Sequence, residues 1–316
     1  MKDYILGIDT SNYTTSVALI NSNGEIISDE RIVLDVKAGE RGLRQSEALF
    51  KHTQNLNILF NKVFSHTERP NLKAIGVSTR PRNIEGSYMP VFLAGYNVAK
   101  CLGETLKIPV YEFSHQEGHI EAIKAFTNMK NKNDFICFHL SGGTTEILRV
   151  RNGEVEIIGG TLDISFGQLI DRIGVKLGKS FPAGRELDEI ALNSIEQNIN
   201  LITKIKINNL KFNLSGIETG LNRLIGSVSN EMVVFEMFNK ISICLKELCV
   251  KCRDEYKDVS DIIFAGGVSE SRFIRSQIKN ALYGNYGADN AVGVALLGGN
   301  EIWQLNQLKL DKSIAT

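Results

Sequence analysis

The sequence predicts an α/β protein of two duplicated lobes, each a mixed sheet flanked by helices. One order of elements occurs twice along the 316 residues: three strands with tight turns between them, then a helical stretch, then strand–loop–helix. Hairpin-linked strands followed by crossover helices are typical of mixed sheets. We expect an N-terminal lobe of residues 1–112 plus 290–316 and a C-terminal lobe of residues 113–289, with a ligand cleft between them.

The strands of each copy are short apolar runs separated by turn residues. Asn23-Gly24 and Asn152-Gly153 are strong hairpin signals between such runs. A long helix with one broad apolar face is expected over 230–256. The expected strands are 4–8, 15–20, 25–32 and 74–77 in the first copy and 135–140, 145–150, 154–158 and 261–264 in the second, with closing helices over 87–102 and 269–282.

Composition limits the classes of function. The formal net charge is zero, whereas a protein that binds nucleic acid unaided usually carries a basic excess. The local basic run of Arg172, Lys176, Lys179 and Arg185 is either an RNA patch or a solvated helix face. No apolar run approaches the ~20 residues that span a bilayer, and no signal peptide precedes the first strand. We expect a cytoplasmic protein that does not contact membranes.

The five cysteines do not indicate a disulfide framework, because their number is odd and they lie in apolar runs. Cys249 and Cys252 have the spacing of half a zinc site. They fall inside the expected long helix, however, and no second pair exists in the chain. We therefore assign them to the core or the surface.

Four small-residue turns are suited to hold oxyanions, because glycine allows backbone amides to approach a ligand closely. Each turn alone is weak evidence, since glycine turns at strand ends are usually only turns. Their matching places in a duplicated fold favour a nucleotide-like ligand. The turns are Asp9-Thr10-Ser11, Ser141-Gly142-Gly143-Thr144-Thr145, Pro182-Ala183-Gly184 and Gly266-Gly267-Val268-Ser269.

A pair of histidines suggests a metal site. His115 and His119 stand four residues apart, on one face of an expected helix, and this spacing suits Zn²⁺ or Fe²⁺. Two exposed or capping histidines explain the pattern equally well. A third ligand must come from elsewhere; Asp289 is the candidate, although alone it reads as a helix N-cap. The protease pattern is absent, because no glutamate directly follows the first histidine.

Ordered motifs over nearly the whole chain resemble the TsaD-type tRNA threonylcarbamoyladenosine transferases, formerly called O-sialoglycoprotein endopeptidases. ILGIDTSNYTTSVAL is similar to the family's GIETSCDETSVA, HQEGH to its HxxGH and HLSGGTTEI to its SGGHTQL. The further matches are TLDISFGQLIDRIGVKLGKSFPAGRELDEIA, FNLSGIET, AGGVSESRFIR and GADNAVGVAL.

The resemblance implies an actin-like ATPase (ASKHA) fold. It implies transfer of a threonylcarbamoyl group from threonylcarbamoyl-adenylate to N6 of the adenosine beside the anticodon, in tRNAs that read ANN codons. It also implies one divalent metal, Fe²⁺ or Zn²⁺, a TsaB-like partner and a small TsaE-like ATPase. His115, His119 and Asp289 fall on the family's metal ligands. The implied nucleotide contacts, taken together with the glycine turns, are His139, Leu140, Ser141, Gly142, Gly143, Asp171, Gly184, Asp188, Gly266, Gly267 and Ser271.

The sequence departs from the family in four motifs. Thr144 replaces the histidine of SGGHT, Ser271 the asparagine of VSANR and Glu218 the lysine of SGLKT. The glycine-rich GPGLxGS becomes RPRNIEGS at residues 80–87. Three alternatives therefore stand beside the transferase: an actin-like kinase or ATPase, an inactive partner-binding paralogue, and a metalloendopeptidase, which the missing glutamate disfavours.

Overall fold

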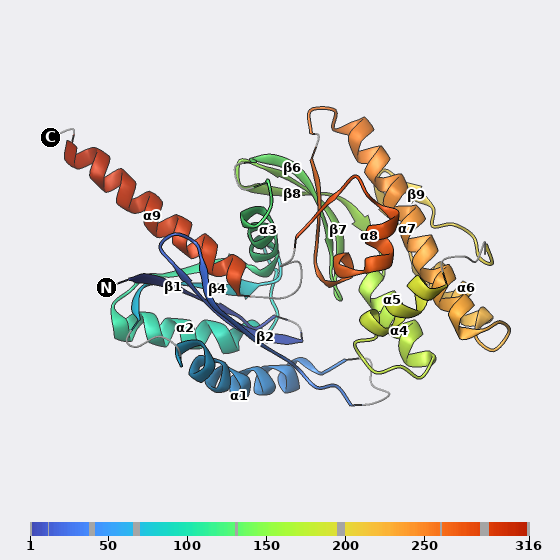
Figure 1. Cartoon of the computed structure of the whole chain (residues 1–316), viewed down its shortest axis with the longest axis horizontal. Helices are drawn as coiled ribbons and strands as arrows, with labels where there is room; N and C mark the ends of the chain where they lie inside the picture. The colour runs from blue at the N-terminus through green and yellow to red at the C-terminus, as the bar shows by residue number, and fades with distance from the viewer. Residues whose placement is uncertain are drawn as a thin grey trace. The chain divides into compact units, whose positions relative to one another are not determined.

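The computed structural model describes residues 2–11, 13–37, 42–65, 70–129, 132–194, 200–259, 261–284 and 291–314, with side chains up to residue 303. The chain divides into two compact units. Unit 1 comprises Met1–Asp35, Leu43–Phe126 and Asp289–Thr316, and unit 2 comprises Val36–Gly42 and Thr127–Ala288. Figure 1 shows both units and labels most of their helices and strands. No helix of the described part is long and apolar enough to cross a membrane.

Unit 1 is built on a five-stranded sheet in the order β3-β2-β1-β4-β5. The first three strands form an antiparallel meander, whereas β4 and β5 run parallel to β1. The strands are β1 (Asp3–Asp9), β2 (Thr14–Asn21), β3 (Ile26–Val33), β4 (Asn71–Arg80) and β5 (Val110–Ser114), and the helices are α1 (Gln45–Phe64), α2 (Phe92–Leu106), α3 (His115–Ala125) and α9 (Val292–Ile314).

Helices cover both faces of this sheet (Figure 1). On one face, alternate strand residues such as Leu6 and Ile8 join a buried cluster with Leu59 of α1 and Ala99 of α2. On the other face, α9 lies directly on the strands at glycine. A Cβ at Gly76 would stand 1.9 Å from the carbonyl oxygen of Val294, so any side chain there would displace the helix.

The boundary between the units differs from the predicted one at residue 112. Helix α3, with both histidines of HQEGH, belongs to unit 1. It packs against α9 so closely that a Cβ at Gly293 would stand 1.8 Å from the carbonyl oxygen of Gly118. This contact joins residues far apart in the sequence, and a pattern read along the chain does not reveal it.

Unit 2 repeats the same layout. Its sheet has the order β12-β11-β6-β7-β8-β10-β9; β6, β7 and β8 form an antiparallel meander, and β11 and β12 extend it in parallel. The predicted duplication is therefore confirmed. The strands are β6 (Asp134–Leu140), β7 (Thr145–Arg151), β8 (Glu154–Thr161), β9 (Ile207–Asn208), β10 (Lys211–Phe212), β11 (Ile262–Ala265) and β12 (Leu282–Tyr283).

Helices pack on one face of this sheet around a large apolar core. Phe138 and Phe264, on neighbouring strands, stack with ring centroids 4.8 Å apart, and Phe238 and Leu245 of the long helix are buried in the same cluster. The helices are α4 (Phe166–Lys176), α5 (Gly184–Asn193), α6 (Ser215–Leu224), α7 (Asn230–Glu255) and α8 (Arg272–Gln277), with a 3₁₀ turn η1 (Gly267–Glu270).

The prediction of one helix over 269–282 is wrong. The backbone of Ser271 is not helical, with φ −54° and ψ 118°, so it separates η1 from α8. Its hydroxyl accepts the backbone N–H of Ile274 and caps α8. Residues 282–283 then form β12. All five cysteines are free, as expected, and Cys249 and Cys252 are buried in α7.

Candidate functional site

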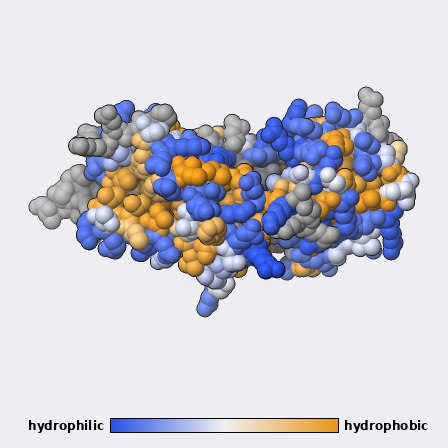
Figure 2. All heavy atoms as spheres, turned by 90° about the horizontal axis from the view of Figure 1, so that it is seen from below, coloured by the Kyte–Doolittle hydropathy of each residue, from blue (hydrophilic) through white to orange (hydrophobic). Residues whose placement is uncertain are grey.

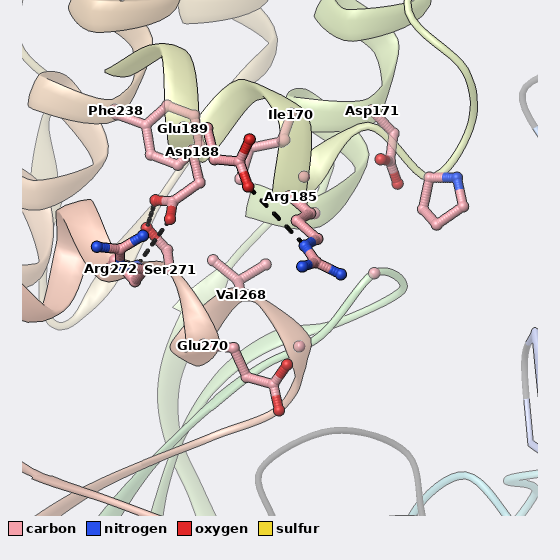
Figure 3. Close-up of a pocket in the computed structure, with 15 residues that line it drawn as sticks. Ile170, Asp171, Arg185, Asp188, Glu189, Phe238, Val268, Glu270, Ser271 and Arg272 are labelled. Atoms are coloured by element: carbon pink, nitrogen blue, oxygen red, sulfur yellow. Dashed lines mark hydrogen bonds and ion pairs between the residues drawn. The ribbon is translucent and has the colours of Figure 1, made fainter. Parts of the chain in front are cut away.

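A cavity of about 520 Å³ lies in unit 2, where glycine turns meet the ends of α4, α5 and α8 (Figure 3). Its volume falls in the range of small-molecule sites. Every lining residue belongs to unit 2: Gly142, Gly167, Ile170, Asp171, Pro182, Gly184, Arg185, Asp188, Glu189, Phe238, Gly267, Val268, Glu270, Ser271 and Arg272.

Close backbone packing holds the turn after β6 in place. A Cβ at Gly167 would stand 2.5 Å from Cα of Gly142, so α4 begins directly against this turn. The Ser165 hydroxyl, which caps α4, also donates to the Gly142 carbonyl over 2.7 Å. A Cβ at Gly266 would stand 2.5 Å from the carbonyl oxygen of Leu140, and φ of Gly266 is +86°. Two of the predicted turns thus lie side by side at the end of β6.

The third predicted turn, Pro182-Ala183-Gly184, is linked to α4 through Asp171. The Asp171 carboxylate accepts the backbone N–H of Ala183 over 2.8 Å, just before α5 begins at Gly184. Burial raises the pKa of Asp171 to about 6, and the hydrogen bond from Ala183 only partly opposes this shift. Asp171 therefore changes its charge close to neutral pH.

Asp188 has a different environment, although it lines the same cavity. Its carboxylate accepts the Ser271 hydroxyl and the backbone N–H groups of Arg272 (2.9 Å) and Phe273 (3.1 Å). These donors form the N-terminus of α8, where the helix dipole also favours negative charge. Asp188 thus ties α5 to α8, and the hydroxyl of Ser271 is committed to this link.

The remaining lining has an apolar wall and a charged rim. Ile170, Val268 and Phe238 form the wall, and Figure 3 shows their side chains beside the acidic and basic groups. Arg185 is highly exposed, and its guanidinium lies 4.0 Å from the Glu189 carboxylate. This combination suits a ligand with one flat apolar part and one anionic part.

Six of the predicted contact residues line the cavity: Gly142, Asp171, Gly184, Asp188, Gly267 and Ser271. The other five lie in the strand end and turns beside them: His139, Leu140, Ser141, Gly143 and Gly266. The periodicity of residues 230–256 predicted a broad apolar face but no cavity contact of Phe238, and Arg185 was predicted only as part of a basic run. Five further lining residues were not predicted, namely Gly167, Ile170, Glu189, Glu270 and Arg272. The position of Gly167 just after a helix cap was the available signal.

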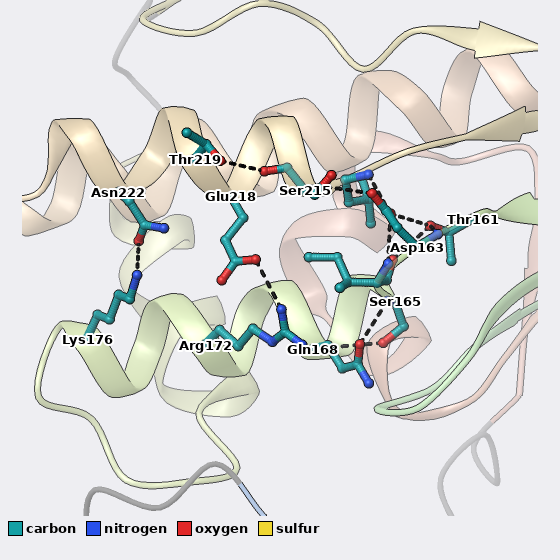
Figure 4. A network of polar contacts seen from close by, with 12 residues as sticks. Thr161, Asp163, Ser165, Gln168, Arg172, Lys176, Ser215, Glu218, Thr219 and Asn222 are labelled. Atoms are coloured by element: carbon teal, nitrogen blue, oxygen red, sulfur yellow. Dashed lines mark hydrogen bonds and ion pairs between the residues drawn. The ribbon is translucent and has the colours of Figure 1, made fainter.

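Two departures from the family motifs find partners within unit 2. Glu218 on α6 pairs with Arg172 on α4 over 3.1 Å, in a network that also joins Lys176 to Asn222 (Figure 4). The Thr144 hydroxyl lies 3.2 Å from Nδ1 of His139 and 2.7 Å from the Ser141 hydroxyl, inside the turn. Neither Glu218 nor Thr144 lines the cavity.

In unit 1, the two histidines of HQEGH face each other at the start of α3. Nε2 of His115 and Nε2 of His119 are 2.8 Å apart, and both rings are buried. Ser114 and Glu117 form a capping box that fixes the first turn of α3. Asp9 and Ser11 lie beside His115, and the hydroxyl of Thr10 bonds to the Val91 carbonyl. The side chains of the predicted turn Asp9-Thr10-Ser11 are therefore engaged with other groups of the protein.

The two histidines of the predicted metal site are spaced to bind one divalent ion. Two nitrogens bound to one Zn²⁺ at about 2.0–2.1 Å stand about 3–3.4 Å apart, within a few tenths of the observed separation. Asp289 lies outside the described residues. Among the described residues, no group of three or more histidines, cysteines or acids is placed to hold a metal.

The RPRNIEGS segment is attached to the same helix turn. The Arg80 guanidinium donates to the Asn83 side chain over 2.8 Å and lies 4.0 Å from the Glu117 carboxylate. Asn83 in turn donates to Glu117 over 3.4 Å, and the Pro81 carbonyl accepts the N–H of Gln116. The arginine and asparagine of this motif thus hold the loop on the helix that carries both histidines.

Solved structures with the same fold define the class of protein. The activator of the 2-hydroxyisocaproyl-CoA dehydratase from Clostridium difficile, with bound ADPNP, aligns with a TM-score of 0.57 at 14% identity over 96% of this chain and 97% of that chain. HypF from T. kodakarensis aligns with a TM-score of 0.60 at 13% identity over 96% of this chain and 48% of that chain. The fold is that of the actin-like ATPases.

Sequence comparison then identifies the family. The TsaD family, described as tRNA N6-adenosine threonylcarbamoyltransferase, matches residues 26–295, and the chain belongs to it. The enzyme of that name from Neorickettsia sennetsu is 28% identical over 87% of this chain and 83% of its own length. The one from Buchnera aphidicola subsp. Baizongia pistaciae is 26% identical over 98% of this chain and 96% of its own.

Proposed function

We propose that this chain transfers the threonylcarbamoyl group from threonylcarbamoyl-adenylate to N6 of the adenosine beside the anticodon in tRNAs that read ANN codons. The observation that carries the proposal is the family match over residues 26–295, which contains the whole cavity lining and both histidines. The actin-like kinase and the inactive scaffold share the fold, but the relatives from Neorickettsia sennetsu and Buchnera aphidicola are both named tRNA N6-adenosine threonylcarbamoyltransferase.

The unit 2 cavity would hold the adenylate. The apolar wall of Ile170, Val268 and Phe238 suits an adenine ring, and the Asp171 carboxylate suits ribose hydroxyl groups as an acceptor. Gly142 and Gly143 are exposed residues, and their amides would donate to the phosphate or the acyl oxygen. The N6 amine would attack the carbamoyl carbon, AMP would leave with the electron pair of the broken acyl–phosphate bond, and the amine would release one proton to solvent. Holding both reactants in line supplies much of the rate.

His115, His119 and Asp289 would hold one divalent ion, Fe²⁺ or Zn²⁺. When bound, such an ion supplies Lewis acidity toward a substrate oxygen. The capping box at Ser114 and the packing of α3 on α9 keep both imidazoles in place for this role.

Further proposals concern partners and location. The basic run over residues 172–185 is one of two alternatives, an RNA patch or a solvated helix face, and it is partly engaged in ion pairs: Lys179 pairs with Glu186 over 2.6 Å and Arg172 with Glu218. We infer that tRNA binding relies on a complex with a TsaB-like partner and a small TsaE-like ATPase in the cytoplasm. The apolar side chains of Phe50 and Ile58 on α1 are exposed and suit contact with a protein partner. Figure 2 shows apolar areas among polar ones on one face of the molecule.

The test is nucleoside mass spectrometry of ANN-decoding tRNA after incubation with this protein, its partners and threonylcarbamoyl-adenylate. We expect threonylcarbamoyl-adenosine with the native chain and its loss with His115→Ala. His52→Gln is the matched control, because His52 bonds Thr15 over 2.9 Å on the other face of the unit 1 sheet. Absence of the modified nucleoside with every chain, while a TsaD enzyme from another organism forms it, would refute the proposal.

A further inference from the structure

We propose that Asp9 is a positioning residue, which holds the His115 ring so that its Nε2 faces the proposed metal. This inference rests on the metal part of the proposed function. It concerns a carboxylate that does not belong to the predicted ligand set. The geometry that carries it lies entirely within unit 1.

Three neighbouring parallel strands end at this point. Asp9 is the last residue of β1, Ser78 lies near the end of β4, and His115 follows β5 directly. Because the carboxyl ends of adjacent parallel strands meet at one edge of a sheet, residues from distant parts of the chain converge there.

The Asp9 carboxylate is 1% exposed and is held from several sides. Its Oδ1 accepts the backbone N–H of Ser11 (3.2 Å) and the hydroxyl of Ser78. Its Oδ2 accepts the Ser11 hydroxyl over 3.0 Å and lies 3.0 Å from Nδ1 of His115. A carboxylate fixed in this way cannot turn aside, so it sets the orientation of the imidazole that contacts it.

The contact also selects the tautomer of His115. An ionised carboxylate only accepts hydrogen bonds, so Nδ1 carries the proton that faces Asp9. In the neutral ring, the lone pair is then left on Nε2, the atom that faces Nε2 of His119. A carboxylate behind a metal-binding histidine raises its basicity and fixes its ring, and loss of such a partner typically weakens metal binding about 10–100-fold.

The first measurement is the metal affinity of the purified full chain, with Co²⁺ and Zn²⁺ in competition with a chromophoric chelator. We expect Asp9→Asn to bind about 10–100-fold more weakly than the native chain. Asp9→Glu keeps the carboxylate and should stay within about threefold. The matched control is Asp163→Asn in unit 2, which removes a carboxylate that accepts three backbone N–H groups far from the histidines in sequence, and should leave metal affinity unchanged.

The second measurement needs no substitution. Long-range ¹H–¹⁵N spectra of the five histidines in the metal-free chain report which ring nitrogen carries the proton, and we expect Nδ1–H for His115. This measurement on the native chain tests the inference even if Asp9→Asn fails to fold. A neutral Nε2–H tautomer overturns the inference.

The outcomes separate the two proposals. If His115→Ala binds metal as the native chain does, or the native chain binds none, the metal part of the proposed function fails and the role of Asp9 fails with it. If His115→Ala loses the metal but a folded Asp9→Asn binds it with native affinity, only the role of Asp9 is overturned.

Discussion

Replacement of Asp171 by asparagine should change how stability depends on pH. The pKa of Asp171 is raised from 3.8 to about 6 in the folded chain by burial. The folded state therefore holds a proton on this group over a pH range where the unfolded state has lost it. The contribution to stability is fully present below the unfolded pKa of about 4, and it is lost as pH rises through about 6.

The size of the effect follows from the shift. About two pKa units correspond to at most about 3 kcal/mol, and partial exposure of the carboxylate reduces this to about 2 kcal/mol. Asparagine does not titrate. The free energy of unfolding of Asp171→Asn, minus that of the native chain, should therefore rise by about 2 kcal/mol between pH 4 and pH 7.

Urea unfolding of both chains at several pH values measures this difference. Below about pH 4, Asp163→Asn provides a control of opposite sign, because burial raises the pKa of Asp163 but hydrogen bonds from Leu214, Ser215 and Ile164 together outweigh burial and lower it. The stabilising contribution of Asp163 is present above the ordinary aspartate pKa and is lost as pH falls through its folded value. The free energy of unfolding of the native chain should therefore rise with pH relative to that of Asp163→Asn. Parallel curves for Asp171→Asn and the native chain would refute the assignment of a raised pKa.

Three further measurements test the cavity and the contacts around it. Asp171→Asn should make adenosine binding, measured by calorimetry, insensitive to pH between 5 and 7, whereas native affinity for adenosine should rise with pH as the carboxylate ionises; a flat native profile contradicts a role as acceptor. Gly167→Ala should weaken AMP binding at least about tenfold, because its Cβ would strike Gly142; Gly216→Ala, in α6 with nothing within 4 Å of the added Cβ, is its control. Glu218→Lys should destabilise the chain by about 1 kcal/mol through repulsion from Arg172, and Arg172→Glu should recover the loss in the double variant; additive effects would exclude a direct pair.

The sequence predicted what local chemistry determines. Asn152-Gly153 set the hairpin between β7 and β8, and the same arrangement in both halves revealed the duplicated sheets. The errors lie where a distant contact decides the structure. The hydroxyl of Ser271 bonds to Asp188, which lies 83 residues away, and helix periodicity around Ser271 does not reveal that the helix is broken there.

The candidate site shows the same division. Glycine turns can be recognised from the local sequence, so Gly142, Gly184 and Gly267 were predicted. The apolar wall was not, because Phe238 has the periodicity of any buried helix residue, and only the fold shows that its ring reaches the cavity. A buried face on a helix predicts that a side chain has neighbours, but it does not predict which ones.

Three of the four departures from the family motifs lie in unit 2, and their consequences are unequal. Glu218 reverses a charge, yet it pairs with Arg172 away from the cavity lining, so the change is neutralised locally. Thr144 takes part in a hydrogen-bonded turn behind the lining. Of these three residues, only Ser271 lines the cavity. Its hydroxyl already donates its hydrogen bond to Asp188, so it has no second proton to donate to a ligand. Altered substrate preference therefore has its most direct structural route through Ser271, and Ser271→Asn is the substitution whose effect on AMP affinity should exceed that of Glu218→Lys.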